Sequence, residues 1–370
     1  MTVHVQEVLR SGAESLASLT EKYHIKTKRH GKHPNLIHFK YDQINSLMSE
    51  PLVQQCRGLI LDEADGWNVV ARPFDKFFNL GEGGAAEIDW KTSRPLEKLD
   101  GSLMVVYWYK DEWHVATSGT PDGNGRVRQM AGPFSTQTFR ELFWKTFSHC
   151  GYSQLHLDAR YTWMFELMTP ENRVIIPHVT SRLVLIGLRH LDTGEEVDVL
   201  RHFALDRFEV VKSFNYDSPE ALEQSFETMD GLQQEGYVVV DAQFRRVKVK
   251  HPRYVLYHQM VGSLTKKRVL DAVRQGEAPE VLTYFPSWKT EFEEMHGRYE
   301  ILLDEVAAEY GRICSISSQK DFAREAQKTT CSAAMFSIRA KKVGSFREFF
   351  GAMRIDALAE MLGVEETVGA

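Results

Sequence analysis

The sequence has few cysteines, no long apolar run and no excess of positive charge. Its 370 residues include four cysteines, and none of them belongs to a Cys-x-x-Cys pair. This spacing excludes a cysteine-based zinc site and a disulfide framework of the kind that small secreted domains use. The sequence also lacks any run of about 18 apolar residues that could form a transmembrane helix.

The N-terminal segment and the net charge limit the cellular compartments and the classes of binding partner to be expected. The first 19 residues carry glutamates and serines where a secretory signal has a basic and then an apolar segment. We therefore expect a protein of the cytoplasm with no membrane partner. The formal net charge is -6, whereas nucleic-acid binders usually carry an excess of lysine and arginine. A polyanionic partner would have to meet a local basic patch.

One such patch lies near the N-terminus, at residues 26–33, which read Lys-Thr-Lys-Arg-His-Gly-Lys-His. A segment of this kind is either a solvated loop or an arm that contacts phosphates, and the sequence leaves both open. Its histidines, His30 and His33, have no carboxylate or cysteine at ligand spacing nearby. No metal site is predicted there.

Strand patterns dominate up to about residue 254, and helical patterns follow. β-branched, aromatic and alternating segments predict strands over 36–39, 56–62, 69–74, 103–109, 113–120, 161–168, 183–189, 236–241 and 245–251. Helical spacing predicts helices over 5–23, 135–150 and 292–313, with a further helix starting at Ser345. The expected fold class is α+β, with an antiparallel-sheet domain over 1–254 followed by an all-helical domain over 255–370.

The segment Lys98-Leu99-Asp100-Gly101-Ser102 places a lysine before an Asp-Gly turn, between two strand-like stretches. Asp-Gly is a strong generic hairpin signal, so an ordinary hairpin explains the segment. A lysine on a tight bend can also project its amine as a nucleophile. The rest of the sequence has to decide between these two interpretations.

Five other charged positions are ambiguous when each is taken alone. Arg57 and Lys76 stand beside strand-like segments, and their charge and geometry suit phosphate oxygens. Glu166 interrupts an apolar strand, so it either faces solvent or is held by hydrogen bonds. Lys248 and Lys250 share one face of a strand, which suits a solvated edge strand and a polyphosphate site alike.

Taken together, these positions occur in an order that resembles a known superfamily. The order is that of motifs I, III, IV and V of the covalent nucleotidyltransferases, with Lys98 in Lys-x-Asp-Gly, Glu166 in Phe-Glu-Leu, Glu235 in Glu-Gly-Tyr, and Lys248-x-Lys250. Cys-Arg-Gly at 56–58 and Arg-Pro-Phe-Asp-Lys-Phe-Phe-Asn-Leu at 72–80 further resemble the RNA ligase 1 family of T-even phages. The resemblance implies an ATP-grasp-like adenylyltransferase domain over 1–254 and an RNA-specificity domain over 255–370.

The resemblance also implies an activity. An ATP-dependent RNA ligase would join a 5′-phosphate and a 3′-hydroxyl RNA end through a Lys98-AMP and an adenylylated RNA, using ATP and Mg²⁺ or Mn²⁺. Lys248 and Lys250 would act in catalysis by favouring the neutral, nucleophilic form of the Lys98 amine through charge repulsion. The implied nucleotide contacts are Arg57, Lys76, Phe78, Gly101, Glu166, Lys248 and Lys250. The implied metal ligand is Glu235, with Asp100 as a further candidate.

The RNA itself is less well specified. In the resembling family the helical domain supports recognition of tRNA broken in the anticodon loop, so nicked tRNA is the expected substrate of a monomeric enzyme. It would act in the host cytoplasm if the chain is phage-encoded. A basic cluster between Arg339 and Arg354 could contribute stacking and phosphate contacts. Ser118 stands where the family has a lysine, which weakens one expected phosphate or RNA contact.

Alternative functions stay open. An mRNA-capping guanylyltransferase or a DNA ligase shares Lys-x-Asp-Gly, but usually carries a strand-rich oligonucleotide-binding fold after motif V, where this chain has helical periodicity. A non-catalytic RNA-binding protein with a degenerate nucleotide site predicts loss of Lys98, Glu235 or the lysine pair. All of these are present.

Overall fold

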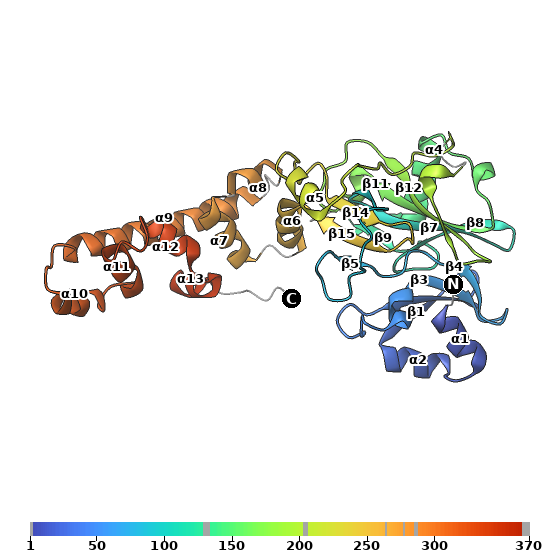
Figure 1. The fold of residues 1–370 in the computed structure, drawn as a ribbon, viewed down its shortest axis with the longest axis horizontal. Helices are drawn as coiled ribbons and strands as arrows, with labels where there is room; N and C mark the ends of the chain where they lie inside the picture. Colours follow the sequence, from blue (N-terminus) through green and yellow to red (C-terminus); the bar gives the residue numbers. More distant parts are fainter. Residues whose placement is uncertain are drawn as a thin grey trace. The chain divides into compact units, whose positions relative to one another are not determined.

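The structure is a computed structural model that describes residues 3–128, 134–202, 206–262, 265–276, 278–284 and 288–364. The chain divides into two compact units, Met1–Val255 and Leu256–Ala370 (Figure 1). The first unit contains the sheets, and the second, as far as it is described, contains helices.

In its described residues, the first unit contains three larger sheets and one small one. The N-terminal sheet has the order β1-β2-β3-β4, with strands Ile25–Arg29, Leu36–Tyr41, Arg57–Asp62 and Asn68–Ala71. The central sheet has the order β13-β12-β11-β7-β8, with strands Glu196–Val197, Arg182–His190, Tyr161–Met168, Ser102–Tyr109 and Glu112–Thr117. The third, here called the site sheet, has the order β5-β15-β14-β6, with strands Phe78–Asn79, Arg246–Lys250, Gly236–Val240 and Arg94–Lys98. The small sheet pairs β9 (Arg126–Arg128) with β10 (Phe134–Thr138).

Neighbouring strands run antiparallel, apart from the parallel pairing of β15 with β5. The mixed helix-and-strand architecture with antiparallel sheets is therefore confirmed. Helices of the first unit are α1 (His4–Ser11), α2 (Leu16–Tyr23), α3 (Pro51–Gln55), α4 (Phe139–His149) and α5 (Pro219–Ser225), with 3₁₀ turns at Gln154–His156, Pro170–Asn172 and Val199–Arg201.

Strand alternation explains how these elements form layers. On β7, Met104 and Val106 face the helix α4, whereas Val105 and Tyr107 pack against the N-terminal sheet. The other face of the N-terminal sheet is covered by α1, α2 and α3, through a separate apolar cluster. Figure 1 shows α1 and α2 beside this sheet. Two sheets are thus stacked between two helical layers.

Two helix boundaries differ from the sequence-based expectation. The single helix expected over 5–23 is two helices, because Gly12 takes a left-handed conformation with φ of 66° and ends α1, and Ser15 caps the start of α2. The helix expected from 135 starts at Phe139. The Thr138 side chain forms a capping box with Glu141 there, and the preceding residues extend into β10.

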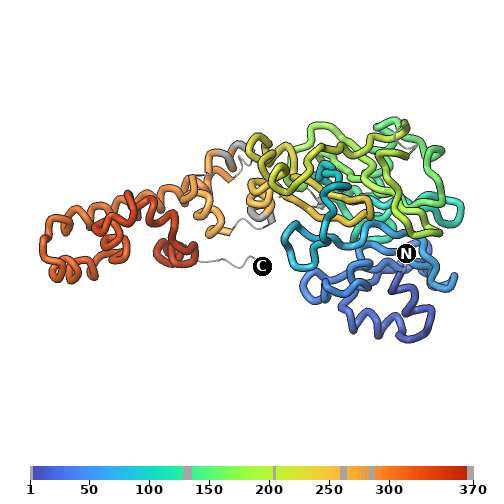
Figure 2. The backbone as a smooth tube through the Cα atoms, in the orientation of Figure 1, coloured from blue at the N-terminus to red at the C-terminus, as the bar shows by residue number. Residues whose placement is uncertain are grey.

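The second unit consists of helices wherever it is described, and its chain can be followed in orange and red in Figure 2. Helix α6 (Pro252–Gly262) crosses the boundary between the units. It is followed by α7 (Lys266–Gln275), α8 (Ala278–Tyr284), α9 (Lys289–Ile313), α10 (Gln319–Ala326), α11 (Ser332–Arg339), α12 (Phe346–Ala352) and α13 (Ile355–Met361). Among the described helices, none combines the length and the apolar character needed to cross a membrane.

Candidate active site

A cavity of about 610 Å³ opens in the first unit where strands of all three larger sheets meet. Its lining includes seven cationic side chains, those of Lys40, Arg57, Lys76, Lys98, Arg246, Lys248 and Lys250. It also includes the carboxylates of Glu97 and Glu166. A cavity with this excess of positive charge suits a polyanionic ligand such as a nucleoside triphosphate.

Most of the residues expected to bind the nucleotide line this cavity together: Arg57, Lys76, Lys98, Gly101, Glu166, Lys248 and Lys250. Asp100 and Glu235 are both buried, each with 3% of its surface exposed. Phe78 lines a second cavity instead, and its neighbour Phe77 lines both. Phe77 is thus one of the aromatic side chains that line the cavity beside the cationic residues, together with Tyr41, Phe74 and Phe139.

Lys98 is the last residue of β6, at a junction between two sheets. Strand β6 pairs with β14 in the site sheet, whereas β7, which begins at Ser102, pairs with β11 and β8 in the central sheet. The Leu99-Asp100-Gly101 turn thus carries the chain from one sheet to the other. The ordinary-hairpin interpretation is wrong, and the turn projects Lys98 into the cavity.

Gly101 and Asp100 fix the shape of this turn. A Cβ atom on Gly101 would lie 2.4 Å from the carbonyl oxygen of Leu167, so no other residue fits against β11 without a shift. The Asp100 carboxylate accepts hydrogen bonds from the backbone N–H groups of Ile175 and Ile176, at 2.8 and 2.6 Å, and from the Tyr254 hydroxyl at 2.6 Å. Three donors already satisfy this carboxylate, which suits an anchor of the turn.

Glu235 bridges two of the lysines from the start of β14. Its Oε2 lies 2.5 Å from the Lys98 Nζ, and its Oε1 lies 3.0 Å from the Lys250 Nζ. The register explains this arrangement, because Gly236 is paired with Lys98 on one side and with Lys250 on the other. Gly236 has φ of 139°, and a Cβ there would lie 2.2 Å from the carbonyl oxygen of Val249, so only glycine fits.

Lys248 and Lys250 lie on β15, inside the site sheet. Because β15 pairs with β14 on one side and β5 on the other, the edge-strand interpretation is wrong. Val247 and Val249 face an apolar cluster that includes Leu222 of α5, so alternation turns both lysines to the cavity. Burial, together with the charges of neighbouring cations of which Lys76 is the first, lowers the pKa of Lys248 to about 7.

Arg57 and Lys76 approach the cavity over aromatic rings. The Arg57 guanidinium lies 5.4 Å from the centre of the Phe77 ring, and the Lys76 ammonium lies 5.2 Å from that of Phe78. Burial lowers the pKa of both groups. Phe78 thus contacts the Lys76 ammonium group but is not itself among the residues that line the cavity.

Glu166 lies on β11 beside the nucleophile turn, opposite Leu103 of β7. Burial raises the pKa of its carboxyl to about 8; the Lys98 charge opposes this shift, and the carboxylates of Glu235 and Asp100 add to it. The sequence left open whether Glu166 faces solvent or is held by hydrogen bonds; in the structure its side chain lines the cavity.

A raised carboxyl pKa makes stability depend on pH. The folded protein keeps a proton on Glu166 between the ordinary carboxyl pKa and about 8, so this stabilising contribution is complete at low pH and is lost as pH rises through about 8. Each pH unit in that range costs up to about 1.4 kcal/mol. Urea unfolding at pH 5, 7 and 9 should therefore show Glu166→Gln gaining stability relative to the wild type as pH rises. Parallel pH profiles would contradict the raised pKa.

The sequence reasoning missed Lys40, Tyr41 and Arg246, which all line the cavity. Lys40 is on β2, and its Nζ lies 3.7 Å from the position that a Cβ on Gly119 would occupy. An ammonium group is thus present next to Ser118, where the resembling family has a lysine. The only sign of Lys40 in the sequence was a cation directly after the apolar strand 36–39. That pattern does not show which strand lies opposite, so it could not place Lys40 at the cavity.

Known RNA ligases resemble this chain in sequence. Residues 55–254, more than half of the chain, match the sequence model of a family described as RNA ligase. The RNA ligase of Rhodothermus phage RM378 is 30% identical over 290 residues, which cover 63% of this chain and 64% of that protein. The RNA ligase 1 of bacteriophage TS2126 is 28% identical over 236 residues, covering 60% of this chain and 56% of that protein.

These alignments span less than two thirds of each relative's own length. The alignment with a solved archaeal ATP-dependent RNA ligase covers 83% of both chains at 13% identity, with a TM-score of 0.44. The family match contains the lysine turn, both motif glutamates and the lysine pair, and these are the residues that meet at the cavity. The chain therefore belongs to the RNA ligase family.

Proposed function

We propose that this protein is an ATP-dependent RNA ligase that joins 5′-phosphate and 3′-hydroxyl RNA ends, with Lys98 as the nucleophile. The observation that carries the proposal is the Lys98 side chain at a cation-lined cavity, with its Nζ held 2.5 Å from Glu235. Membership of the RNA ligase family supports the reaction class.

In the first step the neutral Lys98 amine attacks the α-phosphorus of ATP. A P–N bond forms and pyrophosphate leaves. Glu235 Oε2 is within hydrogen-bond reach of the amine and can take its proton. Arg57, Lys76 and Lys248 offset the charge of the triphosphate, because positioning and electrostatics dominate phosphoryl transfer.

The next two steps act on RNA. An oxygen of the 5′-phosphate attacks the phosphorus of Lys98-AMP, the P–N bond breaks, and the amine recovers a proton. The 3′-hydroxyl of the other end then attacks the activated 5′-phosphorus, its O–H bond breaks with release of the proton, a phosphodiester bond forms and AMP leaves. Lys250 is the second cation beside Glu235, so the site keeps a positive charge while the amine of Lys98 carries AMP.

A Mg²⁺ or Mn²⁺ ion fits this site at Glu235. Such ions prefer oxygen ligands and are often held by one or two carboxylates together with substrate phosphates. The present partners of Glu235 are the ammonium groups of Lys98 and Lys250. Triphosphate oxygens can take the place of Glu235 as partners of these ammonium groups, which leaves its carboxylate to the ion. When bound, the ion would offset charge on the triphosphate. Asp100 fits less well, because three hydrogen-bond donors already satisfy its carboxylate.

The second unit is the candidate for choosing the RNA, and we propose nicked tRNA as the substrate. Two arginines of its basic cluster have internal partners: Arg347 pairs with Glu300 at 2.7 Å, and Arg339 lies 4.0 Å from the centre of the Phe322 ring. Lys341 and Lys342 are exposed, which leaves their charges accessible to RNA phosphates.

The decisive test is incubation of the full chain with α-labelled ATP or α-labelled GTP and Mg²⁺. Label from ATP alone should become attached to the protein through an acid-labile bond, because a phosphoramidate hydrolyses in acid. Label from GTP alone would indicate a capping guanylyltransferase. RNA binding with no labelling by either nucleotide would indicate a non-catalytic RNA-binding protein.

The same preparation can be tested for its nucleic-acid substrate. The proposal expects sealing of 5′-phosphate, 3′-hydroxyl RNA ends and much slower sealing of the matching nicked DNA. Faster sealing of tRNA nicked in the anticodon loop than of a linear RNA supports the tRNA assignment. Equal rates would remove tRNA specificity and leave the ligase assignment intact.

A further inference from the structure

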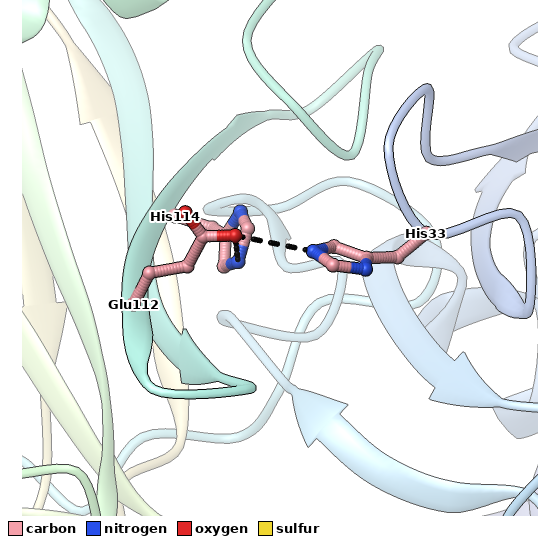
Figure 3. Close-up of side chains that lie close together, drawn as sticks. All are labelled: His33, Glu112 and His114. Atoms are coloured by element: carbon pink, nitrogen blue, oxygen red, sulfur yellow. Dashed lines mark hydrogen bonds and ion pairs between the residues drawn. The ribbon is translucent and has the colours of Figure 1, made fainter.

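Three metal-ligating side chains converge at a place outside the cavity described above. His33 lies in the connection between β1 and β2, and Glu112 and His114 lie on β8, an edge strand of the central sheet. Figure 3 shows the three side chains pointing toward one another, His33 from the β1–β2 connection and Glu112 and His114 from β8. The pair on β8 follows from alternation, since residues 112 and 114 share one face of the strand.

The distances fit a small divalent ion. Glu112 Oε1 lies 3.2 Å from His33 Nε2 and 3.5 Å from His114 Nε2. A tetrahedral site with metal–ligand distances of about 2.0–2.1 Å has ligand atoms roughly 3.3 Å apart. One ligand atom from each residue lies within 4.8 Å of the others. Small side-chain rotations would therefore bring all three atoms to the distances of a tetrahedral site.

The surrounding residues bury the two imidazole side chains and hold the loop that carries His33. The His33 and His114 side chains are only 10% and 9% exposed. Behind them, the Nδ1 of buried His30 accepts hydrogen bonds from the backbone N–H groups of Lys32 and His33, both at 3.1 Å. This contact fixes the loop that presents His33, as hydrogen bonds behind a ligand do in metal sites.

We propose that His33, Glu112 and His114 bind a divalent transition metal of the zinc class, with a water molecule as the fourth ligand. Imidazole nitrogens favour Zn²⁺ and its neighbours over Mg²⁺, so the site is chemically separate from the carboxylate at Glu235. The ion ties the β1–β2 connection to β8 and so links two sheets. None of its ligands lines the cavity that holds Lys98, so the ion lies outside the site of adenylylation and we expect it to stabilise the contact between the two sheets.

Two contacts compete with the ion. The Lys32 Nζ lies 2.5 Å from Glu112 Oε1, and His114 Nε2 also lies 3.2 Å from the carbonyl oxygen of Tyr109. The metal must displace the ammonium and turn the His114 nitrogen away from the carbonyl. Removing Lys32 should therefore tighten metal binding, which a simple ion-pair network does not predict.

The test uses the full chain, stripped with a chelator and exchanged into chelator-free buffer. Zn²⁺ titration by calorimetry should show one ion per chain, and Co²⁺ should give the absorption of a tetrahedral complex. His33→Gln and Glu112→Gln should each weaken binding by more than the roughly 100-fold typical of losing a residue that only orients a ligand. Lys32→Met should strengthen it.

The matched control is His296→Gln. His296 and Glu300 form another histidine–glutamate pair, with Nδ1 and Oε1 3.5 Å apart on one helix, but neither belongs to the three-residue cluster. This variant should bind Zn²⁺ like the wild type. Circular dichroism checks that all variants fold, and thermal unfolding with and without Zn²⁺ reports the structural role.

Several results would overturn the proposal: no one-to-one Zn²⁺ binding to the wild type, equal loss in His296→Gln, or unchanged affinity in His33→Gln and Glu112→Gln. Unchanged affinity in Lys32→Met would also count against it. Labelling of His33→Gln by α-labelled ATP should match the wild type, so failure of the zinc site and failure of the ligase assignment are distinguishable.

Discussion

Replacement of Lys98 by alanine or arginine should abolish covalent attachment of AMP. The amine is the atom that bonds to phosphorus, and alanine removes it. Arginine keeps the positive charge beside Glu235 but presents a guanidinium that stays protonated and is a poor nucleophile. Loss of a covalent nucleophile typically costs more than about 10⁴-fold in rate, so labelling should fall below detection in both variants.

The two variants should differ in stability, and this difference separates chemistry from folding. The Glu235 side chain is 4% exposed, so Lys98→Ala leaves a buried carboxylate with Lys250 at 3.0 Å as its remaining ion-pair partner among the described residues. Lys98→Arg retains the pair. Alanine should therefore lower the urea midpoint more than arginine does, while both lose labelling. Label on either variant would remove Lys98 from its role.

The motif residues that the sequence singled out lie close together because their spacing is tied to strand register. Lys98 and Lys250 flank Gly236 across three neighbouring strands, and strand periodicity already placed Lys248 and Lys250 on one face. Residues that fall at fixed offsets along paired strands must meet when the strands pair. This is why individually ambiguous positions came together at one cavity.

What the sequence could not predict depends on pairing between distant segments. The Lys98 turn looked like a hairpin because nothing local shows that β6 pairs with β14 and β7 with β11. The lysine pair looked like an edge strand because its second neighbour, β5, is a two-residue strand far earlier in the chain. Lys40 and the histidine–glutamate cluster were missed for the same reason, since His33 and Glu112 are 79 residues apart.

ATP binding should weaken as pH rises above about 7, because of Lys248. Burial and neighbouring cations lower its pKa to about 7 in the free protein, so the side chain is largely neutral at pH 8 and above. Phosphate oxygens favour the ammonium form, and binding must then take up a proton. The Kd for ATP should rise by up to about 10-fold per pH unit above pH 7 and be insensitive to this group below it.

The measurement is the Kd of ATP between pH 6.5 and 9.5, made in a Lys98→Arg background so that no covalent product forms. Adding Lys248→Arg should flatten the profile, because a guanidinium stays charged throughout this range. Lys248→Met should bind weakly at every pH and also show no slope. Lys250→Arg is the matched control and should keep the wild-type slope. A profile that is flat up to pH 9 in the Lys98→Arg protein with Lys248 intact would contradict the assignment of Lys248 to the phosphates.

The free energy of unfolding should rise with pH while the affinity for ATP falls. A general effect of alkaline pH on the protein would not produce these opposite changes. A lysine whose pKa is lowered on folding binds fewer protons in the folded than in the unfolded state between pH 7 and its ordinary pKa near 10.5. The free energy of unfolding contributed by Lys248 therefore rises with pH across this range, while affinity for ATP falls. Urea unfolding of the ligand-free protein and of Lys248→Met should diverge above pH 7 in favour of the wild type. A general loss of structure at alkaline pH would lower stability and binding together, so opposite slopes identify the buried lysine as their common cause.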